Sequence, residues 1–155
     1  MTTTVQSPFV NHVGDDELPW ADTGVGIEIK MMRVSVETGV WVTRNRFQPG
    51  VRIPRHRHTG PVEGYTLTGR WHYLEYDFWN TPGSYIYEPA HSVHTLDVPA
   101  DNTEPTDVLF VINGVLLNLD DNDQVESVSD GPNTLAAYYA LLDAQGIPRP
   151  TGVLS

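Results

Sequence analysis

Short stretches rich in β-branched and aromatic residues, separated by Gly and Pro, fill the middle of the chain from Val25 to about residue 119. Two of them, residues 27–36 and 40–47, flank Thr38 and Gly39, a pattern that predicts a β-hairpin. Further strands are expected near residues 51–58, 64–68, 71–76, 84–87, 93–98 and 107–119. Many short strands between Gly/Pro turns are typical of a β-sandwich or barrel.

One segment near the C-terminus has helical rather than strand periodicity. Its larger apolar residues fall at positions i, i+3, i+4 and i+7, namely Leu135, Tyr138, Tyr139 and Leu142. Asn133 or Thr134 is available as the N-cap, and Gly146 followed by Pro148 ends the pattern. We therefore expect a helix of about three turns packed on the barrel.

The chain is expected to form a single all-β domain with two extensions. Residues 1–24 contain Pro and Gly without periodicity and predict an N-terminal arm that lies over the domain. Residues 25–130 are assigned to the barrel, and residues 131–155 to the C-terminal helix and tail. At 155 residues the chain is long enough for one core.

Composition and charge narrow the classes of function. Hydrophobic residues make up 39% and charged residues 19%, as in ordinary globular proteins. The formal net charge of −11 disfavours binding to nucleic acid or to anionic membranes. No apolar run approaches the ~20 residues of a membrane span, so a cytoplasmic location is expected. Cysteine is absent, so that any metal must be bound by nitrogen and oxygen atoms.

Three histidines form the candidate metal site. His56 and His58 are two apart on a predicted strand, and therefore face the same side. A second stretch, from Gly83, adds a strand, a Pro-containing turn and His94. Three imidazoles suit Fe, Zn, Cu or Ni, and an oxygen ligand would complete the set. The alternative is a pair of exposed strand histidines in a basic patch with Arg52, Arg55 and Arg57.

These two stretches resemble the two sequence motifs of the cupin superfamily. The first motif, G-x5-H-x-H-x(3,4)-E followed by Gly, is matched by Gly50, His56, His58 and Glu63, with Gly69 one residue early. The second motif, G-x5-P-x-G-x2-H-x3-N, is matched by Gly83, Pro89 and His94. It departs from the motif at His91, in a small-residue position, and at Val98, in place of the final Asn. The resemblance implies a jelly-roll β-barrel with a metal at its mouth, commonly assembled as a homodimer or homotetramer.

Within the superfamily, residues 25–120 are similar to 2,4'-dihydroxyacetophenone dioxygenase, to the acetylacetone-cleaving dioxygenase and to ChrR-like cupins. The resemblance implies Fe(II) on His56, His58 and His94. It also places Glu88, six residues before the last histidine, beside the metal. A carboxylate there can act as a catalytic proton acceptor or as a hydrogen-bond anchor, and the alternative is a rim carboxylate paired with an arginine. Glu63 is a candidate fourth ligand, because many cupins use the corresponding glutamate. The alternative for Glu63 is a carboxylate near the metal or at the rim.

The function expected from this resemblance is Fe(II)-dependent dioxygenase cleavage of a C–C bond next to a carbonyl, in a small β-diketone or α-hydroxyketone, with O2 as co-substrate. Tyr65, Trp71, Tyr85 and Phe110 are candidates to line an apolar substrate pocket, although strand aromatics also serve as plain core. Two alternatives remain open. One is an isomerase or decarboxylase with Zn, Mn or Ni, and the other is a non-catalytic metal-binding sensor.

Overall fold

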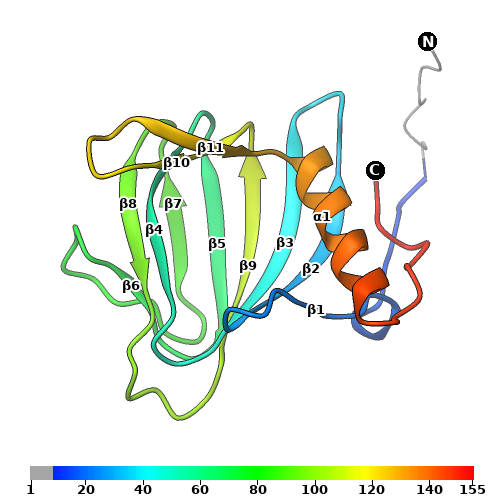
Figure 1. The fold of residues 1–155 in the computed structure, drawn as a ribbon, viewed down its shortest axis with the longest axis horizontal. Coiled ribbons are helices and arrows are strands. Elements are labelled where there is room, and N and C mark those ends of the chain that lie inside the picture. Colours follow the sequence, from blue (N-terminus) through cyan, green and yellow to red (C-terminus); the bar gives the residue numbers. More distant parts are fainter. Residues whose placement is uncertain (1–8) are drawn as a thin grey trace.

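Two antiparallel β-sheets face each other in the computed structural model of the protein, which describes residues 9–155 (Figure 1). The first sheet has the order β1-β2-β3-β9-β5-β7. Its strands are β1 (Ala21–Asp22), β2 (Ile27–Val34), β3 (Val40–Phe47), β9 (Thr106–Asn113), β5 (Val62–Thr68) and β7 (Tyr85–Glu88). The second sheet, β11-β10-β4-β8-β6, contains β11 (Val125–Ser129), β10 (Leu116–Leu119), β4 (Arg52–His58), β8 (Val93–Asp97) and β6 (His72–Tyr73). The predicted all-β jelly roll is confirmed.

The strand predictions agree best with the structure for the long predicted strands. The hairpin of β2 and β3 turns at Gly39, whose φ of 74° suits glycine. The predicted strand over residues 107–119 is instead two strands, because the chain breaks at Gly114. A Cβ on Gly114 would meet Thr59 Oγ1 at 2.5 Å, and its φ is 80°. The expected strand 71–76 shortens to β6, and β1 and β11 have no sequence prediction.

Helix α1 (Gly131–Ala144) closes one end of the sandwich (Figure 1). Tyr138 and Leu142 are fully buried and belong to the same apolar core as Met31 of β2. Asp130 is the N-cap, and its side chain accepts a hydrogen bond from Asn133 N at 2.8 Å, so the predicted caps Asn133 and Thr134 are wrong. The helix ends before Gly146, as predicted. Among residues 9–155, no helix combines the length and apolar character needed to cross a membrane.

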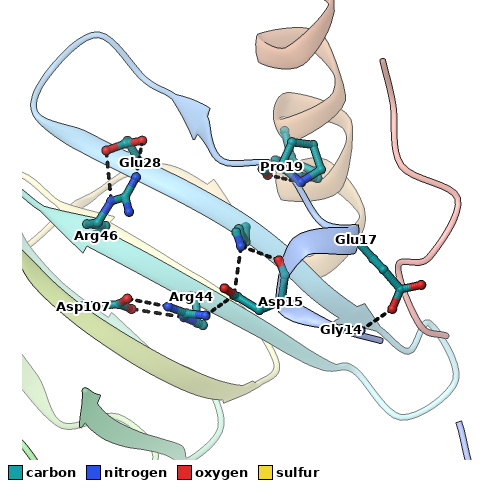
Figure 2. A network of polar contacts seen from close by, with 10 residues as sticks. Gly14, Asp15, Glu17, Pro19, Glu28, Arg44, Arg46 and Asp107 are labelled. Atoms are coloured by element: carbon teal, nitrogen blue, oxygen red, sulfur yellow. Dashed lines mark hydrogen bonds and ion pairs between the residues drawn. The ribbon is translucent and has the colours of Figure 1, made fainter. Parts of the chain in front are cut away.

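The described part of the N-terminal segment is anchored on β2 and β3 by charged side chains (Figure 2). It includes a short 3-10 helix, η1 (Asp15–Glu17). Lys30 Nζ, which is buried, donates to the Asp15 carbonyl at 2.6 Å and to Oδ1 at 2.9 Å. Arg44 also contacts Asp15, and the Trp20 ring lies 4.2 Å from the Arg46 guanidinium. Residues 1–8 of the expected arm lie outside the described residues.

Replacing Asp15 with Asn is expected to lower the free energy of unfolding by about 1–2 kcal/mol, because it leaves the buried Lys30 ammonium without its carboxylate. Chemical denaturation measures the change. Asp16→Asn is the matched control, since Asp16 forms no ion pair among residues 9–155, and it should change stability by less than about 0.5 kcal/mol. Equal effects of the two substitutions would contradict this role of Asp15.

Candidate metal centre

Four buried side chains from both sheets converge between the sheets: His56, His58, Glu88 and His94. Their candidate ligand atoms all lie within 4.8 Å of one another. Strand alternation turns His56 and His58 of β4 inward, and His94 of β8 is the direct cross-strand partner of His56. Glu88 comes from the opposite sheet, at the end of β7. The predicted convergence of the three imidazoles is therefore present.

Several polar atoms of this cluster have no hydrogen-bond partner, although they are buried. They are His58 Nδ1, His94 Nε2 and Glu88 Oε2. His94 Nε2 lies 2.5 Å from Glu88 Oε1 without forming a hydrogen bond of acceptable geometry. Because buried polar groups are normally paired, this set of unpaired nitrogen and oxygen atoms fits a bound cation.

His56 is held by a hydrogen bond from its own strand. Its Nδ1 lies 2.8 Å from the Pro54 carbonyl, which can only accept a hydrogen bond. The proton is therefore on Nδ1, and Nε2 keeps its lone pair. A backbone carbonyl that fixes the tautomer in this way is a common support of histidine metal ligands.

The ring spacing is compact enough for a shared ion. Ring centroids lie 4.8 Å apart for His56 and His94, 5.4 Å for His56 and His58, and 6.4 Å for His58 and His94. Nitrogen and oxygen ligands about 2.0–2.2 Å from one zinc ion lie at most about 4.4 Å from each other. Small side-chain adjustments are enough to bring the four residues within this limit.

Burial favours the neutral form of His56 and His58, which is the form in which an imidazole binds a metal ion. The pKa of His58 is lowered to about 4, mainly by desolvation and also by the nearby His56 and His94, against the opposing charge of Glu88. Desolvation also lowers the pKa of His56. Burial raises the pKa of Glu88, but the contacts with His94, His58 and Tyr73 outweigh this effect, and the net pKa is lowered. At neutral pH, His56 and His58 are therefore neutral imidazoles and Glu88 is a carboxylate.

These shifts predict the pH dependence of the metal-free protein. The unfolded chain protonates His58 near pH 6.5, whereas the folded chain does so near pH 4. Between these values the unfolded state binds a proton that the folded state lacks, so stability falls as pH is lowered through this window, by up to about 3 kcal/mol. Thermal unfolding at several pH values should show a smaller slope for His58→Gln than for His12→Gln, a control at an exposed histidine. An identical slope for the two variants would disprove the assignment.

Comparison with known proteins assigns the chain to a protein family. The family of the ChrR cupin-like domain matches residues 10–117, more than half of the chain. The chain belongs to this cupin family. No curated protein sequence matches it.

Three solved structures are similar to this cupin over most of its length. An RmlC-like cupin from Ralstonia eutropha JMP134 is 27% identical, with 95% of each chain covered and a TM-score of 0.86. A protein of unknown function with a cupin-like fold from the same organism is 29% identical, with 94% of each chain covered and a TM-score of 0.82. An acetylacetone dioxygenase from Acinetobacter johnsonii is 18% identical, with 91% of this chain and 97% of that chain covered and a TM-score of 0.75. The last likeness is one of fold.

The structure corrects the expectation for Glu63, because the cupin cluster does not include this residue. On β5, Val62, Gly64 and Thr66 face inward, so that Glu63 lies on the outer face and is exposed. Its Oε1 accepts a hydrogen bond from the Tyr85 hydroxyl at 2.6 Å. The carboxylate that joins the three histidines is Glu88. The alternation of β5 would have excluded Glu63 from the site if the buried face of this strand had been known.

Of the four predicted pocket residues, one lines the cavity and three do not. Tyr65 and Tyr85 are exposed on the outer face of β5 and β7, so the structure does not bring them to the cavity. Trp71 is fully buried in the core and donates from Nε1 to Thr66 Oγ1 at 2.9 Å, outside the cavity lining. Phe110 does line the cavity.

An apolar cavity of about 210 Å³ lies inside the cupin barrel beside the cluster. His56, His58 and Glu88 are part of its wall. Its apolar lining consists of Phe47, Ile53, Val62, Leu96, Phe110, Ile112 and Leu116, with Tyr73 beside Glu88. A few polar groups in an apolar cavity are typical of a small-molecule site.

Sequence reasoning missed Tyr73, which contacts two residues of the cluster. Its hydroxyl donates to Glu88 Oε1 at 2.9 Å, and its ring stacks on His94 with centroids 4.0 Å apart. Burial and the charge of Glu88 raise the pKa of Tyr73 well above its usual value, so it remains a donor. Trp71 and Tyr73 are two apart, so the sequence indicated that they share one face of a strand. That this face lies beside His94 follows only from the pairing of β6 with β8.

The other histidines lie outside the cluster. His91 is an exposed turn residue with a φ of 66°, and its backbone N–H donates to the His58 carbonyl at 2.7 Å. His72 stacks on Trp79 with centroids 4.0 Å apart. His12 is exposed. None of these three histidines belongs to the cluster of possible metal ligands.

Proposed function

We propose that this cupin is a non-haem Fe(II)-dependent dioxygenase that cleaves a C–C bond next to a carbonyl in a small β-diketone or α-hydroxyketone. The observation that carries the proposal is the buried cluster of three histidines and Glu88 beside an apolar cavity. The fold likeness to an acetylacetone dioxygenase supports the same reaction class.

The size and lining of the cavity favour a small, weakly polar substrate. Its volume of about 210 Å³ is below the ~300–1,000 Å³ of sites for drug-sized ligands. Its apolar walls would exclude water from the reacting carbons. A compact diketone or hydroxyketone meets both conditions, whereas a sugar would leave many hydroxyl groups unpaired.

The donor set fits an iron ion held by His56, His58 and His94. All three are buried, and imidazole is a good ligand for Fe, Zn and Ni. When bound, Fe(II) supplies the one-electron and O2 chemistry that side chains lack. The three neutral ligands leave the full positive charge of the ion available to an anionic substrate oxygen.

We assign the proton transfer of this reaction to Glu88. Its unpaired Oε2 is buried beside the cavity, and a carboxylate there can accept the proton from the carbon or hydroxyl next to the substrate carbonyl. Tyr73 donates to Oε1 and so orients the carboxylate. Both atoms of O2 enter the products, so that a β-diketone gives a carboxylic acid and a dicarbonyl without an external reductant.

Anaerobic purification, metal analysis and reconstitution with Fe(II) or Zn(II) test the proposal. The iron form should consume one O2 per substrate with acetylacetone or a 2-hydroxyacetophenone, and the zinc form should consume none. Mass spectrometry should identify the acid product. Turnover of a sugar or keto acid by the Zn or Mn form without O2 would favour the isomerase or decarboxylase alternative. Metal binding without turnover across the panel would favour a sensor.

A further inference from the structure

One polar side chain inside the barrel lacks a hydrogen-bond partner although it lies outside the metal centre. Asn45 is on β3 and shares the inward face of this strand with the buried Trp41, Thr43 and Phe47. It lines the apolar cavity beside the metal centre, and its Oδ1 is buried without a partner among residues 9–155. A buried amide oxygen without a partner destabilises the fold, so its position is expected to have a role other than folding.

We propose that Asn45 is a specificity-determining residue, whose amide forms hydrogen bonds with a neutral polar group of the substrate on the side of the cavity away from the metal centre. This inference rests on the proposed function and deepens it, because it assigns the ketone substrate a second polar group and names the residue that recognises this group.

The strand order places Asn45 across the cavity from the metal centre. In the first sheet, β9 and β5 separate β3 from β7, which carries Glu88. At about 4.8 Å per strand, these three steps amount to roughly 14 Å across the sheet. Asn118 of β10 and Ser129 of β11 also line the cavity, and both strands lie on the side of β4 away from β8 and His94. The cavity therefore has its metal-binding groups on one side and amide and hydroxyl groups on the other.

The chemistry of this far side selects a neutral group of the substrate. The Asn45 amide offers both a donor and an acceptor, and a hydroxyl group can pair with either. Asn118 Nδ2 donates to Ser127 Oγ at 3.0 Å, which leaves the Asn118 amide oxygen as a further acceptor. None of the described residues that line the cavity is Lys or Arg, so a substrate carboxylate or phosphate would be desolvated there without a counterion. A hydroxyl or carbonyl group fits this side, and an acidic group does not.

Binding of matched β-diketones to the Zn(II)-loaded protein tests the inference without turnover. The probes are 1-phenylbutane-1,3-dione and its 4-hydroxyphenyl and 4-carboxyphenyl analogues, followed by the ultraviolet absorption of the diketone. The hydroxyl analogue should bind about tenfold more tightly than the parent, because the parent leaves the Asn45 oxygen unpaired. The carboxylate analogue should bind more weakly than the parent. Asn45→Leu, which keeps nearly the same shape, should bring the affinities of the hydroxyl analogue and the parent close together.

Thr43→Val is the matched control for Asn45→Leu. Thr43 lies on the same face of β3, and its Oγ1 is also buried and unpaired among residues 9–155, but Thr43 does not line the cavity. Its substitution likewise replaces a polar side chain with an apolar one of similar shape. The Thr43→Val variant should therefore keep the tenfold preference for the hydroxyl analogue.

Thermal unfolding of the metal-free protein gives a second readout that needs no ligand. Asn45→Leu should raise the melting temperature by about 2–4 °C, because it removes an unpaired buried polar group without changing the volume of the side chain. A residue kept for the stability of the fold would show the opposite sign. A residue kept for substrate recognition can lower stability in the free protein.

Three results would overturn the role of Asn45 and leave the proposed function intact. They are equal affinities of the wild-type protein for the hydroxyl analogue and the parent, a preference that survives Asn45→Leu, and a melting temperature that Asn45→Leu lowers. Failure of the zinc form to bind any of the three diketones would instead contradict the proposed substrate class, and this inference with it.

Discussion

Replacing His94 with alanine is expected to abolish metal retention. His94 is almost fully buried, is the cross-strand partner of His56 and lies 2.5 Å from Glu88, so it occupies the centre of the cluster. Loss of a supporting residue around a metal site typically costs 10–100-fold in affinity, and loss of a ligand should cost more than about 100-fold. Metal content after reconstitution and dialysis, measured per chain by mass spectrometry, gives the result.

His91→Asn is the matched control for this experiment. His91 is three residues away in the same motif but exposed and outside the cluster, and Asn tolerates its positive φ. The control should keep one metal ion per chain. Circular dichroism shows whether the His94→Ala variant is folded, because the substitution also removes the ring that stacks on Tyr73. A folded His94→Ala variant with full metal content would disprove the ligand assignment.

Glu88→Gln is expected to keep the metal ion and to lose turnover by about 10²–10⁴-fold, the usual contribution of general acid–base catalysis. Glutamine has the same shape and can still accept the hydrogen bond from Tyr73, but it cannot take a proton. O2 uptake with the iron form measures the loss in kcat. A fully active Glu88→Gln variant would rule out a proton-transfer role, and a variant without metal would instead make Glu88 a ligand.

The control for Glu88 is Glu63→Gln, which changes the other carboxylate suggested by the cupin motifs. Glu63 is exposed and hydrogen-bonded to Tyr85 on the outer face. Its substitution should leave metal content and kcat near the wild-type values. The pair of variants therefore tests directly which of the two glutamates serves the site.

The histidines could be predicted from the sequence because strand geometry has little freedom. Residues two apart on a strand share a face, so His56 and His58 define the metal-facing side by themselves. His94 required a second strand, which the Pro and Gly punctuation around residues 83–93 supplied. The helix was predictable for the same reason, since Tyr138 and Leu142 follow one periodicity.

The carboxylate and the pocket needed information that local patterns lack. Glu63 and Glu88 each lie within one of the two motif stretches. Their directions follow from the buried faces of their strands: Glu63 is next to the buried Val62 and so points outward, whereas Glu88 is two residues after the buried Ile86 and so points inward. Aromatic residues on strands have the same ambiguity, which explains why Tyr65 and Tyr85 were placed in the pocket and Tyr73 was missed. The break at Gly114 depends on contact with Thr59, more than 50 positions away in the chain.

Crystals grown anaerobically with Fe(II) and measured at the iron absorption edge would locate the metal ion itself. We expect a single anomalous peak per chain, within bonding distance of nitrogen atoms of His56, His58 and His94 and next to the Glu88 carboxylate. A structure in which these side chains surround no metal, or in which the peak lies elsewhere, would contradict it.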